Sequence, residues 1–194
     1  MISPTPYASR DRLAEADTLF QELWETDAVS GVKNPDEYAK VLGKRADVCF
    51  RLGRLDQAET LEREALAVRR GIFGTNHIAI LTNMGNLAST LSAQGKHGEA
   101  EQYLRQVVAG REKILQANLP SIFSFLKSKT ALGAVLYHQG MYDESAGLYA
   151  ASIELANRVG LPQRFADGWQ EELSEVVRKM SEGNEIAAAD ITSV

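Results

Sequence analysis

The stretch Gln94-Gly95-Lys96-His97-Gly98-Glu99-Ala100-Glu101 decides the fold, because its pattern occurs twice more along the chain, at residues 52–59 and 139–146. Each copy has a glycine after a helical run, then a short turn, then a helix start with small residues. The glycines, Gly53, Gly95 and Gly140, are spaced 42 and 45 residues apart. A period in this range predicts stacked supersecondary units, which build an extended surface suited to binding.

A second set of residues supports the same register. Pro35, Pro120 and Pro162 each stand at the expected start of a helix, where a missing N–H costs nothing. They are spaced by 85 residues, which is two periods, and by 42 residues. One period after Pro35 the chain has Ile78, directly after residues 75–77, which contain good capping residues. Four helix starts are therefore expected.

The apolar residues recur at spacings of three and four along these segments, which predicts amphipathic helices throughout. We expect an all-α, right-handed superhelical solenoid of antiparallel helix pairs that forms one domain over residues 1–194. The expected parts are a partial unit at 7–26, repeats at about 35–70, 77–115 and 120–158, and a terminal partial unit at 162–191. In that last unit, Gly183 is expected to end one helix, and a short helix follows.

Composition narrows the classes of function. The net charge of −5 disfavours a nucleic-acid surface, which needs clustered Lys and Arg. The chain has no apolar run of about 18 residues, so we expect no membrane span, and its first residues lack the features of a signal peptide. The single cysteine, Cys49, fits a reducing compartment. These observations predict a cytoplasmic protein without nucleic-acid or membrane partners.

The two ends of the array are expected to differ from its middle. The first helix matches the second helix of a unit, since Ala16 lies 42 residues before Ala58, and its own first helix is missing. Each end therefore exposes a face that a neighbouring unit would normally cover. Three interpretations stay open: a helical cap, an interface for self-association that yields a homo-oligomer, or a fragment of a longer array.

Three segments carry a resemblance to a known family: residues 80–91, with Asn86-Leu87-Ala88 at their centre, residues 94–101, and Arg111-Glu112-Lys113-Ile114-Leu115. The chain resembles tetratricopeptide repeats, especially the 42-residue subclass found in kinesin light chains. The resemblance implies small residues where helices cross, at Ala46, Ala58, Ala65, Ala88 and Ala100, with Gly133 and Ser145 in the third repeat.

The resemblance also implies a function. In this family the first helices of the repeats line a concave groove in which peptides lie, so we expect a scaffold or adaptor that binds a protein or peptide partner. Lys44, Arg51 and Lys127 would hold acidic groups, Asn86 would bind the peptide backbone, and Phe50 and Tyr137 would offer flat contacts. By register, the groove positions are Lys40, Lys44, Asp47, Phe50, Arg51, Thr82, Asn86, Ser89, Lys127, Thr130, Tyr137 and His138.

The sequence gives weaker support for a catalytic or metal-binding function. His77 is expected at a helix start, His97 in a turn between helices and His138 on the groove face. The three histidines thus lie on different parts of the units, so no shared metal site and no cofactor are expected. Cys49 is expected to be a buried structural thiol. The chain is expected not to be an enzyme, although a small-molecule site near Asp47, Arg51, Tyr137 and His138 stays a less favoured alternative.

Overall fold

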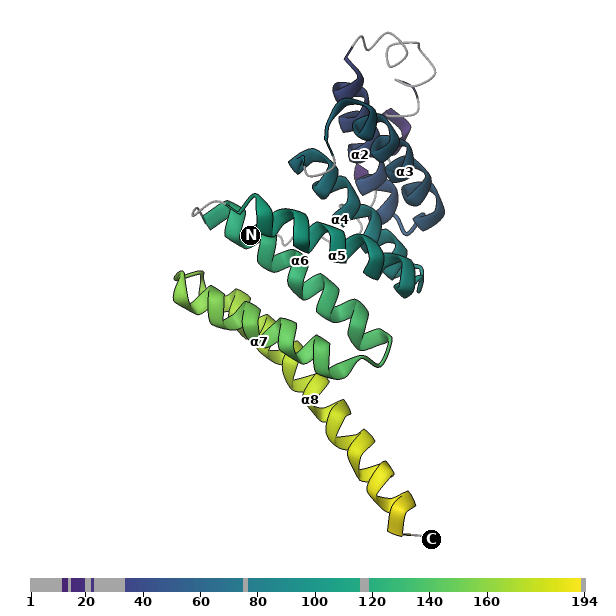
Figure 1. The fold of residues 1–194 in the computed structure, drawn as a ribbon. Coiled ribbons are helices and arrows are strands. Elements are labelled where there is room, and N and C mark those ends of the chain that lie inside the picture. The colour runs from purple at the N-terminus through teal and green to yellow at the C-terminus, as the bar shows by residue number, and fades with distance from the viewer. Residues whose placement is uncertain are drawn as a thin grey trace, which may run out of the picture. The chain divides into compact units, whose positions relative to one another are not determined.

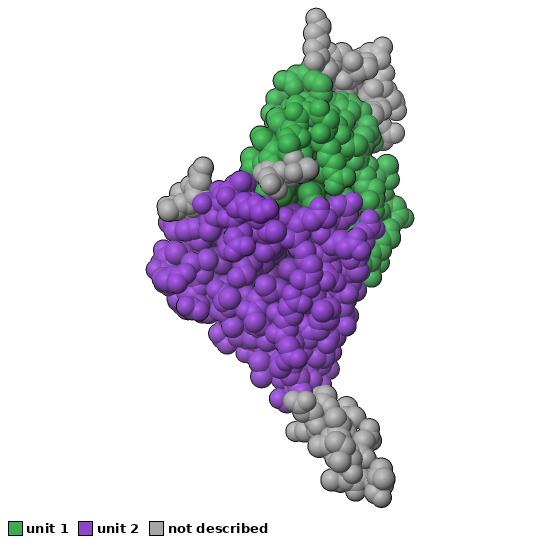
Figure 2. Space-filling model, in the orientation of Figure 1, with its two compact units in different colours: residues 1–96 green, residues 97–194 purple. Residues whose placement is uncertain are grey.

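The computed structural model describes residues 12–13, 15–19, 22, 34–74, 77–115 and 119–192, with side chains described as far as residue 182. The described residues form helices and turns and contain no strand (Figure 1). They divide into two compact units, Met1–Lys96 and His97–Val194, which Figure 2 shows in green and purple. The predicted single domain over residues 1–194 stays a proposal.

Three helices with given bounds belong to the first unit: α2 (Pro35–Arg51), α3 (Leu55–Ile72) and α4 (Ile78–Ala93). Described residues between 12 and 22 are also helical, and the other residues of the predicted partial unit lie outside the described part. Asn34 caps α2 by accepting a hydrogen bond from the Asp36 amide, and His77 caps α4 through Ala79. Pro35 is the first helical residue, as predicted.

The second unit has α5 (His97–Lys113), α6 (Leu119–His138), α7 (Tyr142–Arg158) and α8 (Gln163–Thr192). α6 packs on α5 and on α7, and α8 packs along α7. The prediction that Gly183 ends the last long helix is wrong, because α8 continues to Thr192 as one helix (Figure 1). A glycine inside a helix is tolerated at a cost of about 1 kcal/mol, so it does not by itself set an end.

The repeated glycines end their helices as predicted. Gly53, Gly95 and Gly140 all have φ of 77°. After each one, the next backbone N–H bonds back across the turn to the helix, as in Arg54 N to Cys49 O at 2.9 Å and Lys96 N to Leu91 O at 2.9 Å. This is the hydrogen bonding of a Schellman cap, which needs a left-handed residue that only glycine adopts without strain.

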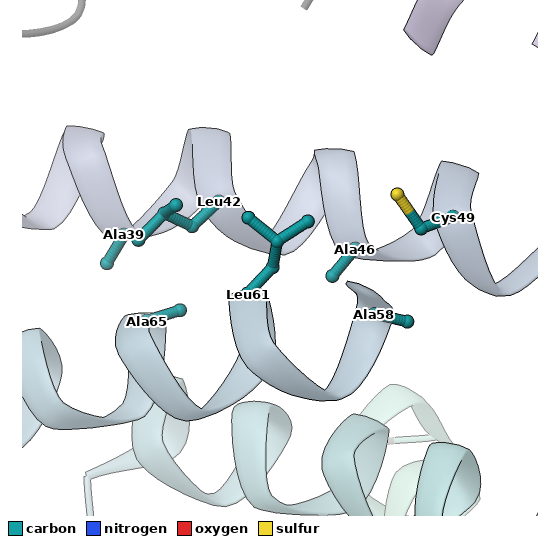
Figure 3. Packing of buried hydrophobic residues seen from close by; sticks show 7 residues of the cluster. All are labelled: Ala39, Leu42, Ala46, Cys49, Ala58, Leu61 and Ala65. Carbon is teal, nitrogen blue, oxygen red and sulfur yellow. The ribbon is translucent and has the colours of Figure 1, made fainter. Parts of the chain in front are cut away.

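Small residues allow the paired helices to approach closely. In α2 and α3 the core is built from Ala39, Leu42, Ala46, Cys49, Ala58, Leu61 and Ala65 (Figure 3). All the small-residue positions implied by the resemblance are buried, namely Ala46, Ala58, Ala65, Ala88, Ala100, Gly133 and Ser145. The Ser145 hydroxyl donates to the Gly133 carbonyl at 2.8 Å, so a polar residue replaces alanine there without an unmet hydrogen bond.

An arginine near the end of the second helix fastens each pair to the next helix. Arg69 donates from one Nη to the Ala79 carbonyl at 3.3 Å and to Asn83 Oδ1 at 2.5 Å. Arg111, one period later, makes the equivalent bonds to the Ser124 carbonyl and, at 2.8 Å, to Ser128 Oγ. The same connection thus recurs in both units with different side-chain partners.

Gly95→Ala is expected to lower the free energy of unfolding by about 1 kcal/mol, because alanine at φ of 77° is strained. Gly85→Ala is the matched control: Gly85 lies inside α4, a Cβ there would meet no atom within 4 Å, and alanine favours helix. Urea unfolding followed by circular dichroism checks both variants. Equal effects of the two substitutions would contradict the cap assignment.

Candidate functional site

The predicted groove positions form exposed stripes on the first helices of the repeats. The α2 stripe consists of Lys40, Lys44, Asp47 and Arg51, all exposed, and Phe50 is exposed beside it. The α4 stripe consists of Thr82, Asn86 and Ser89, also exposed. Both stripes belong to the first unit. Their spacings of three and four residues place each set on one face of its helix.

In the second unit, the α6 stripe is Lys127, Ala131, Ala134 and His138, with Lys127 and His138 exposed. The placement of Thr130 on this face is wrong. Its side chain is 8% exposed, and its hydroxyl donates back to the Leu126 carbonyl at 3.2 Å. Ala131 holds the position that Asn86 holds in α4, and Thr130 holds the position of Gly85.

Two of the predicted cations are already neutralised. Lys40 lies 3.0 Å from Asp36 Oδ2 and 2.7 Å from Glu37 Oε1, and Arg51 Nε lies 2.9 Å from Asp47 Oδ2. Lys44 and Lys127 have no ion pair among the described residues. The available positive charge of the stripes therefore comes from Lys44 in the first unit and from Lys127 in the second.

Tyr137 is less available than predicted. Its hydroxyl donates to Glu175 Oε1 of α8 at 3.0 Å, and this hydrogen bond raises the pKa of the phenol. His138 lies beside it and stacks on His97, with ring centroids 4.8 Å apart. The expectation that the histidines lie on different parts of the units is wrong for this pair. Burial, and then the neighbouring His138, lower the pKa of His97.

The two remaining groups with catalytic potential have structural roles. Cys49 is buried, as predicted, and burial raises the pKa of its thiol, so it is a poor nucleophile at neutral pH. His77 accepts a hydrogen bond from the Ala79 amide at 3.2 Å as the cap of α4. Over the described ranges, no group of three or more His, Cys, Asp or Glu side chains could hold a metal ion.

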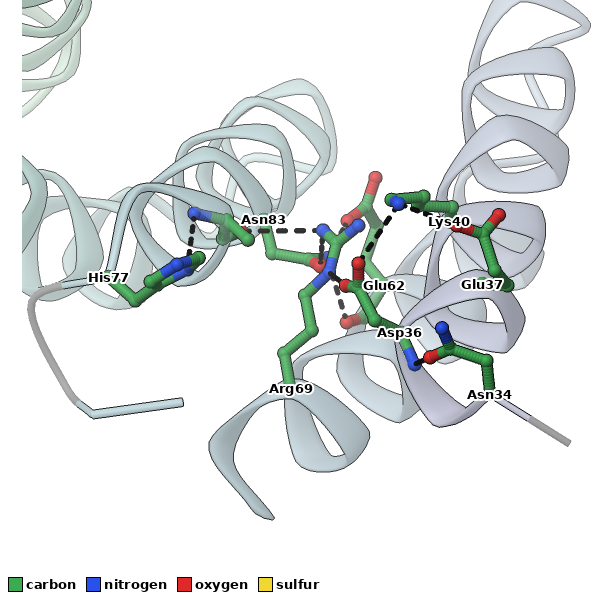
Figure 4. Close-up of polar contacts among 9 residues, drawn as sticks. Asn34, Asp36, Glu37, Lys40, Glu62, Arg69, His77 and Asn83 are labelled. Atoms are coloured by element: carbon green, nitrogen blue, oxygen red, sulfur yellow. Dashed lines mark hydrogen bonds and ion pairs between the residues drawn. The ribbon is translucent and has the colours of Figure 1, made fainter. Parts of the chain in front are cut away.

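The prominent polar feature that the sequence reasoning missed is Glu62. This side chain of α3 is 3% exposed, and its Oε2 lies 2.6 Å from Asn83 Nδ2 (Figure 4). Burial raises the pKa of Glu62 to about 7, while hydrogen bonds from Asn83 and Asn86 and the charge of Arg69 oppose that rise. Asp47 raises it slightly further. Asn83 is therefore the side chain that satisfies the buried carboxyl group of Glu62.

A chain of polar contacts connects Glu62 with the surface of α2. Asn83 Oδ1 accepts from Arg69, Arg69 Nε lies 3.4 Å from Asp36 Oδ1, and Asp36 pairs with Lys40 (Figure 4). Hydrogen bonding from Lys40 is the main cause that lowers the pKa of Asp36. Lys40 is therefore engaged by acidic residues of its own helix, and Asp36 carries the contact on to α3.

A signal in the sequence could have found Glu62. One period after it stands Leu104, and one further period later Tyr149. Both are buried, with 3% and 2% of the side chain exposed. An acidic residue at a register position that is otherwise apolar is a departure from the pattern, and such departures are concentrated at functional or strained sites.

Comparisons with known proteins agree with this geometry. Residues 37–113 match the family model of the tetratricopeptide repeat. These residues are tetratricopeptide repeats. For these residues the predicted resemblance to tetratricopeptide repeats is confirmed, and so is the fold class, an all-α tetratricopeptide-like solenoid of antiparallel helix pairs.

The human relative, mitochondrial tetratricopeptide repeat protein 19, is 28% identical over 143 residues, which are 72% of this chain and 36% of that protein. The chain thus spans about a third of the length of this curated relative. Its repeats also resemble the crystal structure of a protein from Podosopora anserina with nearly identical TPR-like repeats, described as a kinesin light chain. The TM-score is 0.77 at 21% identity, over 92% of this chain and 84% of that one.

A second similar structure is that of a Rap protein complexed with competence and sporulation factor, with a TM-score of 0.67 at 15% identity. The match covers 48% of the Rap protein and 93% of this chain. These likenesses to solved structures concern the fold of the tetratricopeptide repeats. In the described part of the chain, no helix is both long enough and apolar enough to cross a membrane.

The raised pKa of Glu62 makes stability depend on pH. Glu62 is easier to protonate in the folded protein than in the unfolded chain, so it stabilises the fold fully below about pH 4.5, and this stabilisation is lost as the pH rises through about 7. A shift of this size corresponds to roughly 3 kcal/mol. Relative to wild type, Glu62→Gln should therefore become more stable as the pH is raised from 4.5 to 8.

Urea unfolding at several pH values between 4.5 and 8 measures this difference. Glu112→Gln, which removes an exposed carboxylate of α5, is the control and should leave the difference from wild type nearly constant. A constant difference for Glu62→Gln as well would mean that the carboxyl group of Glu62 titrates in the folded protein as it does in the unfolded chain.

Proposed function

We propose that this chain binds an acidic peptide segment of a protein partner, as a scaffold or adaptor without enzymatic activity. The observation that carries the proposal is the charge of the exposed stripes: Lys44 and Lys127 are cations without an ion pair among the described residues, and the other stripe charges are neutralised by their own neighbours. In each unit taken by itself, an acidic segment would find its charge unopposed at one of these lysines.

The polar residues of the α4 stripe support the same proposal. α4 contains no ionisable side chain, and its exposed face offers the Asn86 amide and the hydroxyls of Thr82 and Ser89. The Ser89 hydroxyl donates to the Gly85 carbonyl at 3.1 Å, so its oxygen is left to accept from a partner. Such groups suit the N–H and C=O groups of an extended peptide backbone. Phe50 is 36% exposed beside the α2 stripe and supplies apolar contact area.

The similar structures fit a binding function. The Rap protein has been crystallised with a bound factor, so a fold of this type can receive a ligand. A cytoplasmic location and the absence of nucleic-acid and membrane partners are also part of this proposal. The human relative, by contrast, is a mitochondrial protein. A small-molecule enzyme site near Asp47, Arg51, Tyr137 and His138 is disfavoured, because Arg51 and Tyr137 already bind Asp47 and Glu175.

Lys44→Gln and Lys127→Gln are each expected to weaken binding of acidic peptides about threefold to tenfold, because each removes one unpaired charge at the stripe. The probes are fluorescent peptides selected from a displayed random library on the wild-type protein, and fluorescence polarisation measures their affinity. Selected sequences should be enriched in Asp and Glu.

Arg70→Gln and Lys113→Gln are the matched controls. Both residues are exposed, each lies in the same unit as its test residue, and neither belongs to a stripe. They make the same change in net charge and should alter affinity less than twofold. If the controls weaken binding as much as the test variants do, the interaction depends on net charge alone and the stripes are not the binding surface.

Self-association through the terminal helices is a second proposal. Val177 on α8 is 49% exposed, and the described residues of its own unit leave it uncovered. An apolar side chain of this kind can pair two copies of a chain. Light scattering at rising concentration should then show a dimer that Val177→Lys dissociates, and a monomer at high concentration would exclude this pairing.

A further inference from the structure

The two arginines that fasten helix pairs to the next helix differ in their counter-ions. From Nη, Arg69 donates to Asn83 Oδ1 at 2.5 Å. Arg111 donates in the same way to Ser128 Oγ at 2.8 Å. Arg69 also has a carboxylate partner, because its Nε lies 3.4 Å from Asp36 Oδ1 in the first turn of α2 (Figure 4). The charge of Arg69 is therefore compensated within the first unit.

Arg111 has no such partner. It forms no ion pair with a described residue, and its Nε is buried without a hydrogen bond to the described part of the chain. The sequence explains the difference. Asp36 is the second residue after the cap of α2, and the second residue after the cap of α4 is Ala79. The repeat that ends with Arg111 thus lacks the acidic residue that the preceding repeat supplies.

A guanidinium group that is withdrawn from water without a counter-ion is unfavourable. Burial lowers the pKa of Arg111, and no carboxylate of the described residues opposes this effect. The guanidinium nevertheless stays charged at neutral pH, so the missing charge cannot be avoided by deprotonation. A carboxylate of a binding partner can supply it.

The hydrogen bonds of Arg111 leave one part of its guanidinium group for such a carboxylate. One Nη is taken by the Ser124 carbonyl and the Ser128 hydroxyl of α6. The other Nη has no hydrogen bond to a described residue, and it shares one edge of the planar group with Nε. Two N–H groups on one edge match the two oxygens of a carboxylate. Arg111 is only partly buried, so a partner can reach it.

Arg111 also lies next to the α6 stripe. Ser124 precedes Lys127 by three residues, and residues three apart are neighbours on the surface of a helix. Lys127 is exposed and has no ion pair among the described residues. An acidic segment on the second unit therefore meets two uncompensated cations within about one helical turn.

We propose that Arg111 is a carboxylate-binding residue of the second unit, which pairs with an Asp or Glu side chain of the acidic segment beside Lys127. This inference rests on the proposed function and deepens it, since it names a binding residue outside the exposed stripes. It also describes the ligand: two acidic residues close together, one for Lys127 and one for Arg111.

Two substitutions of Ser128 test the pairing and keep Arg111 in place. Ser128→Asp supplies the missing counter-ion from α6, whereas Ser128→Asn copies Asn83 of the first unit and adds no charge. In fluorescence polarisation with the selected peptides, made with amidated C-termini, Ser128→Asp should bind about tenfold more weakly than Ser128→Asn. Ser128→Asn should stay within about twofold of wild type.

Asn157→Asp is the matched control, because it makes the same change in net charge at an exposed position of α7. It should alter affinity less than about twofold. Circular dichroism checks that each variant keeps its helices. Equal affinities of Ser128→Asp and Ser128→Asn would overturn the proposal, and so would an equal loss in Asn157→Asp. Binding that disappears on amidation of the peptide would assign the carboxylate to the C-terminus instead of a side chain.

NMR of the arginine Nε–H groups tests the same contact in the wild-type protein. The Arg111 signal should shift when a selected peptide is added, whereas the Arg69 signal should not, because Asp36 already faces that Nε. The same peptide with Asn and Gln in place of Asp and Glu should shift neither signal. An Arg111 signal that stays unchanged at saturating peptide would overturn the proposal.

These results separate the inference from the proposed function. If Lys44→Gln and Lys127→Gln leave the affinity for every selected peptide unchanged, the proposed function fails, and the inference fails with it. If Lys127→Gln weakens binding but Ser128→Asp binds as tightly as Ser128→Asn, only the present inference fails.

Discussion

Close contact between paired helices is the constraint on which the other features of this protein depend. Ala46 on α2 faces the helix that carries Ala58 and Ala65, and larger residues such as Leu42 and Leu61 fill the space on either side (Figure 3). Small side chains at the crossing let ridges of one helix enter grooves of the other. The third repeat meets this constraint in another way. Tyr149 is large, and Gly133 opposite it has no side chain: a Cβ there would lie 3.0 Å from the tyrosine ring.

That constraint fixes the core faces of the helices and leaves their outer faces free to differ between repeats. The exposed stripes accordingly vary from charged on α2 to uncharged and polar on α4. Glu62 is unusual because it brings this variation into a core position, where the buried Asn83 amide satisfies its carboxyl group. Buried polar groups of this kind matter more than surface charges, since few water molecules compete with their partners.

Helix positions could be predicted well from the sequence, because glycine and proline act locally. Gly53, Gly95 and Gly140 need a left-handed backbone, and Pro35 fits only a helix start. The prediction for Gly183 was wrong because a glycine ends a helix only where the neighbouring residues also form the cap.

The candidate site was less predictable. Thr130 was assigned to the wrong face, since a threonine that bonds to its own helix can be buried. Whether a lysine can bind a partner depends on the acidic residues near it. Spacing along the sequence identifies those acidic residues only when they lie in the same helix as the lysine. Lys40 could have been paired with Asp36 on that basis, whereas the contact of Asp36 with Arg69 depends on the packing of α2 against α3. The stacking of His97 on His138 likewise depends on the packing of α5 and α6.

The arginine connection shows where this array accepts a change of length. Arg69 reaches a carbonyl 10 residues further along the chain, and Arg111 makes the same bond 13 residues further along. The longer second period is therefore absorbed before Ser124, where α6 starts about one turn earlier relative to this bond than α4 does. Residues inserted at that point lengthen a helix at its outer end and leave every later residue on its original face. Repeats of different lengths can thus be combined in one protein, by evolution or by engineering, without redesigning the surface that each repeat exposes.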